Sequence, residues 1–350
     1  MRLVAAFVSL AAAPVLPGAA ASSSTASPAR SSAARPGPAA PAAPSAAATP
    51  AAPAQTPQEF EAQLRLQIFL DGAGFGPGVV DGRPGEFTRK AVAAWNVAHD
   101  VEDVDDLGRV GREAARSVRT VYAAYTVKPG DLAFVTPGLP TKPELQAKQK
   151  YLGYRSLAEF VAERFHTTEA VLARLNPKVA LGALKAGVVL KVPNVEPFEI
   201  EALPSQRGWK ADDVLSRHAV LINVRHKTAA IYDDRGDLMA LFPITPGREK
   251  FVPYGEWTLA TMVSTPVFRW DKQLLEEGKH SQTAHLLPPG PNSPVGVLWA
   301  GTNRKGIGLH GTATPETIGR SQSAGCIRFA NWDAVRLPKL LRPGSRVIVK

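Results

Sequence analysis

The sequence predicts a multidomain α+β protein. Apolar residues recur at helical spacing between residues 57 and 118, and residues 122–195 have the order strand, helix, helix, strand. From residue 217 apolar and polar residues alternate, as they do along half-buried strands. With 350 residues, the chain can bury one large core and one or two smaller ones.

The amino terminus has the layout of a cleaved secretory signal peptide, which we assign to residues 1–21. A positive charge at Arg2 precedes an apolar run, and a series of small residues ends at Ala21. An uncleaved anchor is the alternative, but the run is shorter than the ~20 residues of a spanning helix and contains Pro14. We therefore expect an exported protein of the periplasm or the cell wall.

Residues 22–56 consist almost entirely of Ala, Pro and Ser, and Arg30 and Arg35 are their only charged residues. Such a composition cannot form a core, so the segment is predicted to be an extended, disordered linker. It would separate the folded part of the chain from the mature amino terminus.

The net charge of +10 is unevenly distributed along the chain. Residues 57–118 contain seven Lys or Arg and eleven Asp or Glu, whereas residues 119–350 contain 31 and 20. In an exported protein the natural anionic partners are wall polymers and carboxylate-bearing peptidoglycan stems, and the compartment argues against nucleic acid. A basic surface that only aids solubility is the alternative.

The first folded unit, residues 57–118, is predicted to contain three helices. Phe60, Leu64 and Ile68 recur at four-residue intervals in a helix that stops at Gly72, and a turn-rich segment follows. A second helix covers about 86–99. The third presents Val110, Ala114, Val118 and Val121 on one face.

The run LQIFLDGAGFGPGVVDGRPGEFTRKAVAAWNVAHD in this unit resembles the peptidoglycan-binding domain 1 family, a three-helix module that binds the cell wall. Asn96 stands where that family usually has Gln. The resemblance implies wall binding by the module as a whole, and the alternative is that these residues only build the turn and the core. The residues that carry the resemblance are Gly74, Phe75, Pro77, Gly78, Asp81, Gly82, Gly85, Thr88 and Ala91.

Residues 122–195 are predicted to form a second small unit, with a capping box at Ser156 and Glu159. The runs YTVKPGD, ERFHTTEAVLARLNP and LKVPN resemble a LysM module, which binds N-acetylglucosamine in peptidoglycan or chitin. A Pro-containing insertion over 132–150 interrupts the pattern, so glycan binding and a structural spacer role both remain open. The predicted elements are a strand over 125–127, a helix ending near Phe165, a helix over 169–175 and a strand over 188–192.

Residues 217–350 are predicted to form a mostly β domain with one closed or sandwiched core. Val220 and Ile222 alternate with Leu221 and Asn223, and two strands flank a turn at 234–237. Further strands are expected over 256–262, 296–300 and 308–310 and at the carboxyl terminus, and Asn331 is expected to cap a short helix.

Cys326 is the only cysteine in the chain, so it cannot form an internal disulfide. A thiol with a pKa of ~8.5 is mostly protonated at neutral pH and needs a base to react. His310 ends a predicted strand 16 residues earlier, and the loop between them is long enough to return the chain to the same place. The two residues are a candidate nucleophile and base for acyl transfer; an inert buried cysteine and a structural histidine are the alternative.

Residues around Cys326 fit the other requirements of acyl transfer. Gly325 lets the backbone turn sharply and exposes N–H groups to an oxyanion, and Ser323 adds a hydroxyl. Arg328 and Arg320 supply positive charge for a carboxylate-bearing substrate, and the alternative for Arg328 is that it only pairs with a local acid.

The sequence HGT at 310–312, followed by SAGCIRFAN at 323–331, resembles the signature of the L,D-transpeptidase (YkuD) catalytic domain family. The runs FPITPG, PYGEWTLA, LLPPGPNSPVGVLWAG and RVIVK agree with it, so the resemblance covers about residues 217–350. Ala324 stands where many members have His, and residues 252–255 differ by one position from the family's Thr-Pro-Gly.

This resemblance implies that Cys326 is the nucleophile, that His310 is the base, and that the Gly311 carbonyl orients the imidazole. Ser323, Gly325 and Arg328 match the frame of the family motif. Thr312 joins the two arginines as a candidate for substrate binding.

The implied reaction is attack on the third residue of a peptidoglycan tetrapeptide stem, a diamino acid, with release of the terminal D-alanine. The thioester would then pass to an amine on another stem or on a protein. Hydrolysis of the same acyl-enzyme, by an L,D-carboxypeptidase or endopeptidase, is the nearest alternative, and a non-catalytic wall-binding scaffold is the alternative from another class. The chemistry requires no cofactor, and no Cys/His cluster in the sequence has zinc-ligand spacing.

Overall fold

The computed structural model describes residues 55–247, 254–271, 273, 281, 283–304, 307–320 and 325–350. The predicted signal peptide and nearly all of the predicted linker lie outside the described residues, as do Ser323 and Ala324. Among the described residues, no helix combines the length and the apolar character needed to cross a membrane.

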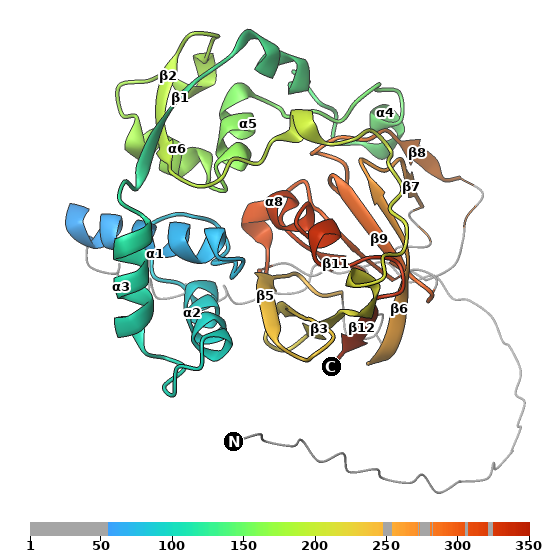
Figure 1. The fold of residues 1–350 in the computed structure, drawn as a ribbon. Coiled ribbons are helices and arrows are strands. Elements are labelled where there is room, and N and C mark those ends of the chain that lie inside the picture. Colours follow the sequence, from blue (N-terminus) through green and yellow to red (C-terminus); the bar gives the residue numbers. More distant parts are fainter. Residues whose placement is uncertain are drawn as a thin grey trace, which may run out of the picture. The chain divides into compact units, whose positions relative to one another are not determined.

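The first unit has the three predicted helices, α1 (Pro57–Gly72), α2 (Glu86–Ala98) and α3 (Leu107–Ser117) (Figure 1). A capping box begins α1, because the Glu59 N–H donates to Thr56 Oγ1 and the Thr56 N–H donates to the Glu59 carboxylate. The third helix is shorter than predicted, because the prediction extended it to Val121. It ends at Ser117, and Val121 lies beyond it in a core shared with the next unit.

Gln67 ties the glycine-rich turn between α1 and α2 to α1. Its buried side chain accepts hydrogen bonds from the backbone N–H groups of Asp81 (3.0 Å) and Gly82 (2.7 Å) and donates to the carbonyl of Arg83 (3.1 Å). Gly82 has a φ of +68°, and a Cβ at this position would meet the Phe60 ring at 2.3 Å. This turn therefore requires glycine at position 82.

The second unit has the predicted order of strand, helix, helix and strand. Its strand β1 begins at Tyr122, ahead of the predicted Tyr125, and pairs antiparallel with β2. Ser156 caps α5 as predicted, but the Glu159 carboxylate accepts from the Arg155 N–H, so only half of the predicted capping box forms. The elements are β1 (Tyr122–Thr126), η1 (Pro129–Phe134), α4 (Pro143–Gln146), α5 (Leu157–Arg164), α6 (Glu169–Leu175), η2 (Leu181–Ala183) and β2 (Val189–Pro193).

The carboxy-terminal domain is built on an eight-stranded sheet with the order β11-β10-β9-β6-β12-β3-β4-β5 (Figure 1). Short helices η3 (Ile200–Ala202) and η4 (Leu215–Arg217) precede it. A separate pair, β7 (Phe268–Trp270) and β8 (His285–Leu287), was not predicted. The sheet strands are β3 (Ala219–Asn223), β4 (Thr228–Tyr232), β5 (Leu238–Pro243), β6 (Gly255–Ser264), β9 (Leu298–Thr302), β10 (Gly308–His310), β11 (Ile327–Arg328) and β12 (Arg346–Val349).

The predicted helix cap at Asn331 is wrong. Asn331 is the first residue of α8 (Asn331–Ala334), the cap position is Ala330, and no side chain caps the helix. The Asn331 side chain is fully buried and bonds to other segments of the chain instead. After α8, the helix η6 (Leu337–Lys339) contributes Leu337 to the core of the sheet.

The three units share their hydrophobic cores. Phe60 and Leu64 of α1 belong to one cluster with Phe160 of α5 and with Val297 and Trp332 of the carboxy-terminal domain. The segment after α1 also covers the sheet edge, because the Gly76 N–H donates to the Leu241 carbonyl of β5 at 2.7 Å. Residues 54–350 accordingly form one compact unit.

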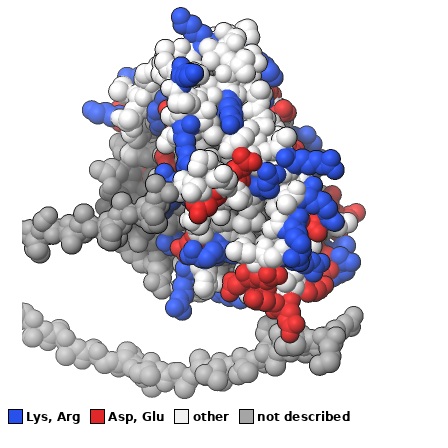
Figure 2. All heavy atoms as spheres, turned by 90° about the vertical axis from the view of Figure 1, so that its left-hand side faces the viewer, with Lys and Arg blue, Asp and Glu red and all other residues white. Residues whose placement is uncertain are grey.

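The surface carries both signs of charge. On the face shown in Figure 2, acidic side chains gather at the lower edge and basic side chains are spread over the remainder. The excess of Lys and Arg in residues 119–350 is therefore not collected into a single patch on this face.

Candidate functional site

The strands β10 and β11 bring the two halves of the candidate site together. They pair in parallel, with Leu309 opposite Ile327 and His310 opposite Arg328. Leu309 and Ile327 are fully buried in the core of the sheet, so the alternation of side chains directs His310 and Arg328 to the other face. Cys326 directly precedes β11, and the loop from His310 thus returns the chain to the neighbouring strand.

His310 is held in one tautomer when it is neutral. Its Nδ1 lies 2.6 Å from the Gly311 carbonyl oxygen, which can only accept, so Nδ1 carries the proton and Nε2 the lone pair. Burial and the nearby charge of Arg328 lower the pKa of His310 to about 4, whereas the hydrogen bond to Gly311 acts in the opposite direction. The imidazole is therefore neutral at neutral pH and can accept a proton through Nε2.

Cys326 lies half-buried beside β10. Burial raises the pKa of its thiol, while the backbone N–H of Gly308 and the charge of Arg328 act in the opposite direction. The thiol is therefore protonated at neutral pH, and its reaction requires a base.

A tryptophan supports this arrangement. The Trp299 ring stacks on the His310 ring, with a centroid separation of 5.6 Å and an interplanar angle of 21°. Gly308 makes room for it, because a Cβ at that position would lie 2.7 Å from the indole. Glycine at position 308 of β10 therefore allows the Trp299 ring to pack against the His310 ring.

His310 ends β10 and Cys326 directly precedes the neighbouring strand β11, so a neutral imidazole and a protonated thiol on adjacent segments stay the candidate base and nucleophile. Residues 217–349 match the family model of the L,D-transpeptidase catalytic domain, YkuD. The match covers the whole sheet and both candidate residues.

Two relatives are similar to part of this chain. A Bacillus licheniformis protein named as an L,D-transpeptidase, YkuD, is 27% identical over 192 residues, which cover 55% of this chain and 92% of the relative. YqjB of Bacillus subtilis, also named as an L,D-transpeptidase, is 28% identical over 137 residues, or 37% of this chain and 69% of the relative.

Among solved structures, L,D-transpeptidase 3 from Mycobacterium tuberculosis is 14% identical, with a TM-score of 0.31 over 48% of this chain and 76% of that chain. An L,D-transpeptidase from Mycobacterium smegmatis is 16% identical, with a TM-score of 0.30. At these values the structural matches carry no argument of their own. The family model covers only the YkuD domain, so the resemblances of the two preceding units to wall-binding modules stay predictions.

The other predicted site residues of the YkuD domain have different surroundings. Gly325 is buried, whereas Arg320 is exposed on the loop between the two candidate residues. Arg328 is half-buried, and among the residues that the structure describes no acceptor lies within hydrogen-bond distance of its Nε. Thr312 is buried, and its hydroxyl accepts from the Thr314 N–H, so its side chain serves a local turn.

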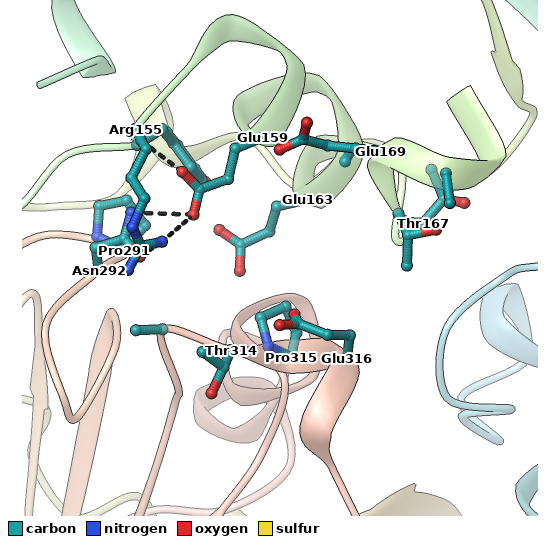
Figure 3. A pocket seen from close by; sticks show the side chains of 15 residues that line it. Arg155, Glu159, Glu163, Thr167, Glu169, Pro291, Asn292, Thr314, Pro315 and Glu316 are labelled. Carbon is teal, nitrogen blue, oxygen red and sulfur yellow. Dashed lines mark hydrogen bonds and ion pairs between the residues drawn. The ribbon is translucent and has the colours of Figure 1, made fainter. Parts of the chain in front are cut away.

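A cavity of about 370 Å³ lies between α5, α6 and the loop that follows Thr312 (Figure 3). Glu159, Glu163 and Glu169 line it from the second unit, and Thr314 and Glu316 line it from the YkuD domain. Figure 3 shows the Glu163 side chain directed from α5 toward that loop. The second unit therefore reaches a segment that begins only three residues after His310.

Three residues near the site were missed from the sequence. All three lie in runs that carry the family resemblances, but no role was predicted for Trp299 or Glu163, and Asn331 was interpreted as a helix cap. An available signal was that Asn331 follows the apolar run Phe329–Ala330 and precedes Trp332. Its position between apolar residues is typical of a buried side chain with specific partners.

Proposed function

We propose that this chain is an L,D-transpeptidase that acts on peptidoglycan stem tetrapeptides through a cysteine acyl-enzyme. The observation that carries the proposal is the match of residues 217–349 to the YkuD catalytic domain, with His310 at the end of β10 and Cys326 directly before the parallel neighbouring strand β11. The donor is a stem whose third residue is a diamino acid and whose fourth is D-alanine.

In the first step the Cys326 thiol gives its proton to His310 Nε2 and its sulfur attacks the carbonyl carbon of the third residue. The tetrahedral intermediate collapses to a thioester, and the imidazolium returns the proton to the departing amine of D-alanine. In the second step an amine of another stem, or of a protein, attacks the thioester and gives its proton to His310. The cysteine thiol is restored and a new amide bond is formed.

The electrostatics of the site support these roles. The neutral His310 has its Nε2 lone pair available because Nδ1–H donates to Gly311. Arg328 brings a positive charge close to both reacting residues, which suits an oxyanion and a carboxylate-bearing stem. Gly325 and Ser323 belong to the same segment, and we assign them to the oxyanion site.

Intact mass spectrometry after incubation with a carbapenem, or with a purified disaccharide tetrapeptide, tests the acyl-enzyme. We expect one covalent adduct on the wild-type protein and none on Cys326→Ala. A wild-type protein that forms no adduct with either reagent would leave only a wall-binding scaffold.

The fate of the acyl-enzyme is measured separately, by chromatography of the muropeptides formed from the tetrapeptide. Cross-linked dimers are the expected product. Free tripeptide without dimers would instead identify an L,D-carboxypeptidase or endopeptidase that uses the same nucleophile.

We further propose that residues 57–118 and 122–195 bind the wall and that the chain is exported. The support is their sequence resemblance to a peptidoglycan-binding module and a LysM module. Sedimentation of the Cys326→Ala protein with purified sacculi measures this binding without turnover. Protein that stays in the supernatant would leave the two units with a structural role.

A further inference from the structure

The peptide unit between Gly311 and Thr312 holds the catalytic histidine from one side. Its carbonyl oxygen accepts the His310 Nδ1 proton at 2.6 Å. Its N–H, which belongs to Thr312, donates to Asn331 Oδ1 at 3.2 Å. Because a peptide unit is planar, the hydrogen bond that fixes the direction of its N–H also fixes the direction of its carbonyl.

Asn331 uses its whole hydrogen-bonding capacity at this place. Its Oδ1 accepts from the N–H groups of Thr312 and Val297, both at 3.2 Å. Its Nδ2 donates to the Glu163 carboxyl at 2.9 Å and to the Pro291 carbonyl at 3.2 Å. The fully buried amide is therefore satisfied on both sides, and only this orientation of the amide satisfies all four partners.

The backbone is packed closely around this amide. A Cβ on Gly311 would lie 2.1 Å from Asn331 Oδ1, and a Cβ on Gly296 would lie 2.0 Å from the same atom. Both positions therefore require glycine, because a side chain at either one would displace the Asn331 amide. A change in the direction of its amide must be passed on to the Gly311–Thr312 peptide unit.

Glu163 extends the network into the second unit. It lies in α5 and is 6% exposed, and its carboxyl accepts from Asn331 Nδ2 and hydrogen-bonds the Tyr154 side chain. Burial raises the pKa of Glu163 to about 8, against its hydrogen bonds to Tyr154 and Asn331. The carboxyl is thus mostly neutral at pH 7, so glutamine is a close substitute for it in charge and shape.

We propose that Asn331 and Glu163 are positioning residues for His310. Asn331 holds the Gly311–Thr312 peptide unit, and Glu163 holds the Asn331 amide in the required orientation. The unit that resembles a LysM module thereby takes part in setting the geometry of the catalytic base of the YkuD domain. This role builds on the proposed function, in which His310 removes the Cys326 proton.

The test measures the reaction of Cys326 with iodoacetamide across pH, together with the thermal unfolding of each variant. Alkylation reports the activation of the thiol by His310 and needs neither a wall substrate nor transpeptidation. Glu163→Ala is compared with Glu163→Gln, which keeps an acceptor for Asn331. Glu169→Gln is the matched control, since Glu169 lines the same cavity without a hydrogen bond to this network.

We expect Glu163→Ala to slow alkylation at neutral pH by about tenfold, the lower end of what loss of an orienting partner costs. Glu163→Gln should restore the rate to within about twofold of the wild type, and Glu169→Gln should not change it. Asn331→Ala should be slower than Glu163→Ala, because it removes the contact to the peptide unit itself.

Two results would overturn the proposal. One is a Glu163→Ala protein that loses thermal stability but keeps the wild-type pH profile of alkylation, which would make Glu163 purely structural. The other is a Glu163→Gln protein as slow as Glu163→Ala. Failure of the proposed function would give a different result. The wild-type thiol would then be alkylated normally but form no adduct with a carbapenem or a tetrapeptide.

Discussion

Neither Cys326 nor His310 is charged at neutral pH in the free protein. Burial depresses the pKa of the imidazole and raises the pKa of the thiol. Many reactive cysteines are instead kept as thiolates by a neighbouring cation. In the proposed mechanism the proton must therefore move to His310 as the sulfur attacks, so the protonation state of His310 is expected to control the reaction.

This control has a measurable pH dependence. We expect the rate of Cys326 acylation by a carbapenem to fall on acidification with a midpoint near pH 4, because His310 keeps its lone pair down to its lowered pKa of about 4. The measurement is the rate of adduct formation by mass spectrometry from about pH 3 to pH 8. A wild-type midpoint near 6.5, the ordinary value for histidine, would contradict the burial argument.

Arg328→Gln should shift the pH dependence of Cys326 acylation to higher pH. The Arg328 charge lowers the pKa of His310, so its removal should raise that pKa and move the acidic midpoint upward. Arg225→Gln, at an exposed position, is the matched control and should leave the midpoint unchanged.

At the scale of single residues, the sequence could predict roles only for residues that belong to a recognisable motif. Cys326 and His310 were predicted as nucleophile and base because the thiol is unique in the chain and the histidine lies 16 residues before it in a motif that resembles the YkuD signature. Asn331 was misassigned because a local rule places asparagine at helix starts. Its actual partners, which include Glu163 and Thr312, are distant in sequence and meet it only in the folded chain.

At the scale of elements, local signals placed helices, whose backbone hydrogen bonds lie within the element, and one short strand that ends at the candidate His310. The helix α6 and the strand β10 have the predicted bounds, and α1 ends at the predicted Gly72. The strands β7, β8 and β11 have three, three and two residues, and they were missed because such short strands exist only through pairing with distant segments.

The turn after α1 offers a test at this scale. Gln67→Ala removes the groups that satisfy the Asp81 and Gly82 N–H groups and the Arg83 carbonyl. We expect a loss of about 1–3 kcal/mol in the free energy of unfolding, the cost of leaving buried polar groups unpaired. Urea unfolding measures it. Gln58→Ala, at an exposed position of the same helix, should change the free energy by less than about 0.5 kcal/mol, and an equal effect of both substitutions would refute the role of Gln67.

At the scale of the whole molecule, a buried ionic cluster joins the three units. Asp71 of α1 accepts from His166 Nδ1 at 3.0 Å and from Arg336 Nη2 at 2.8 Å. His166 follows α5, and its ring stacks on Trp332 of α8 with a centroid separation of 5.2 Å. Although burial alone would raise the pKa of Asp71, His166 and Arg336 lower it, so its carboxylate stays charged at neutral pH.

Asp71→Ala should therefore destabilise the entire described chain rather than its first unit alone. The substitution leaves the buried His166 and the largely buried Arg336 without their shared partner, which costs about 3–5 kcal/mol in the free energy of unfolding. Since the cores are shared, we expect a single unfolding transition by circular dichroism and by tryptophan fluorescence, shifted to lower urea. Asp213→Ala, at an exposed position, is the control. Two separate unfolding transitions in Asp71→Ala would contradict this expectation. If the transition at higher urea had the wild-type midpoint, the YkuD domain would be stable without the cluster of Asp71, His166 and Arg336.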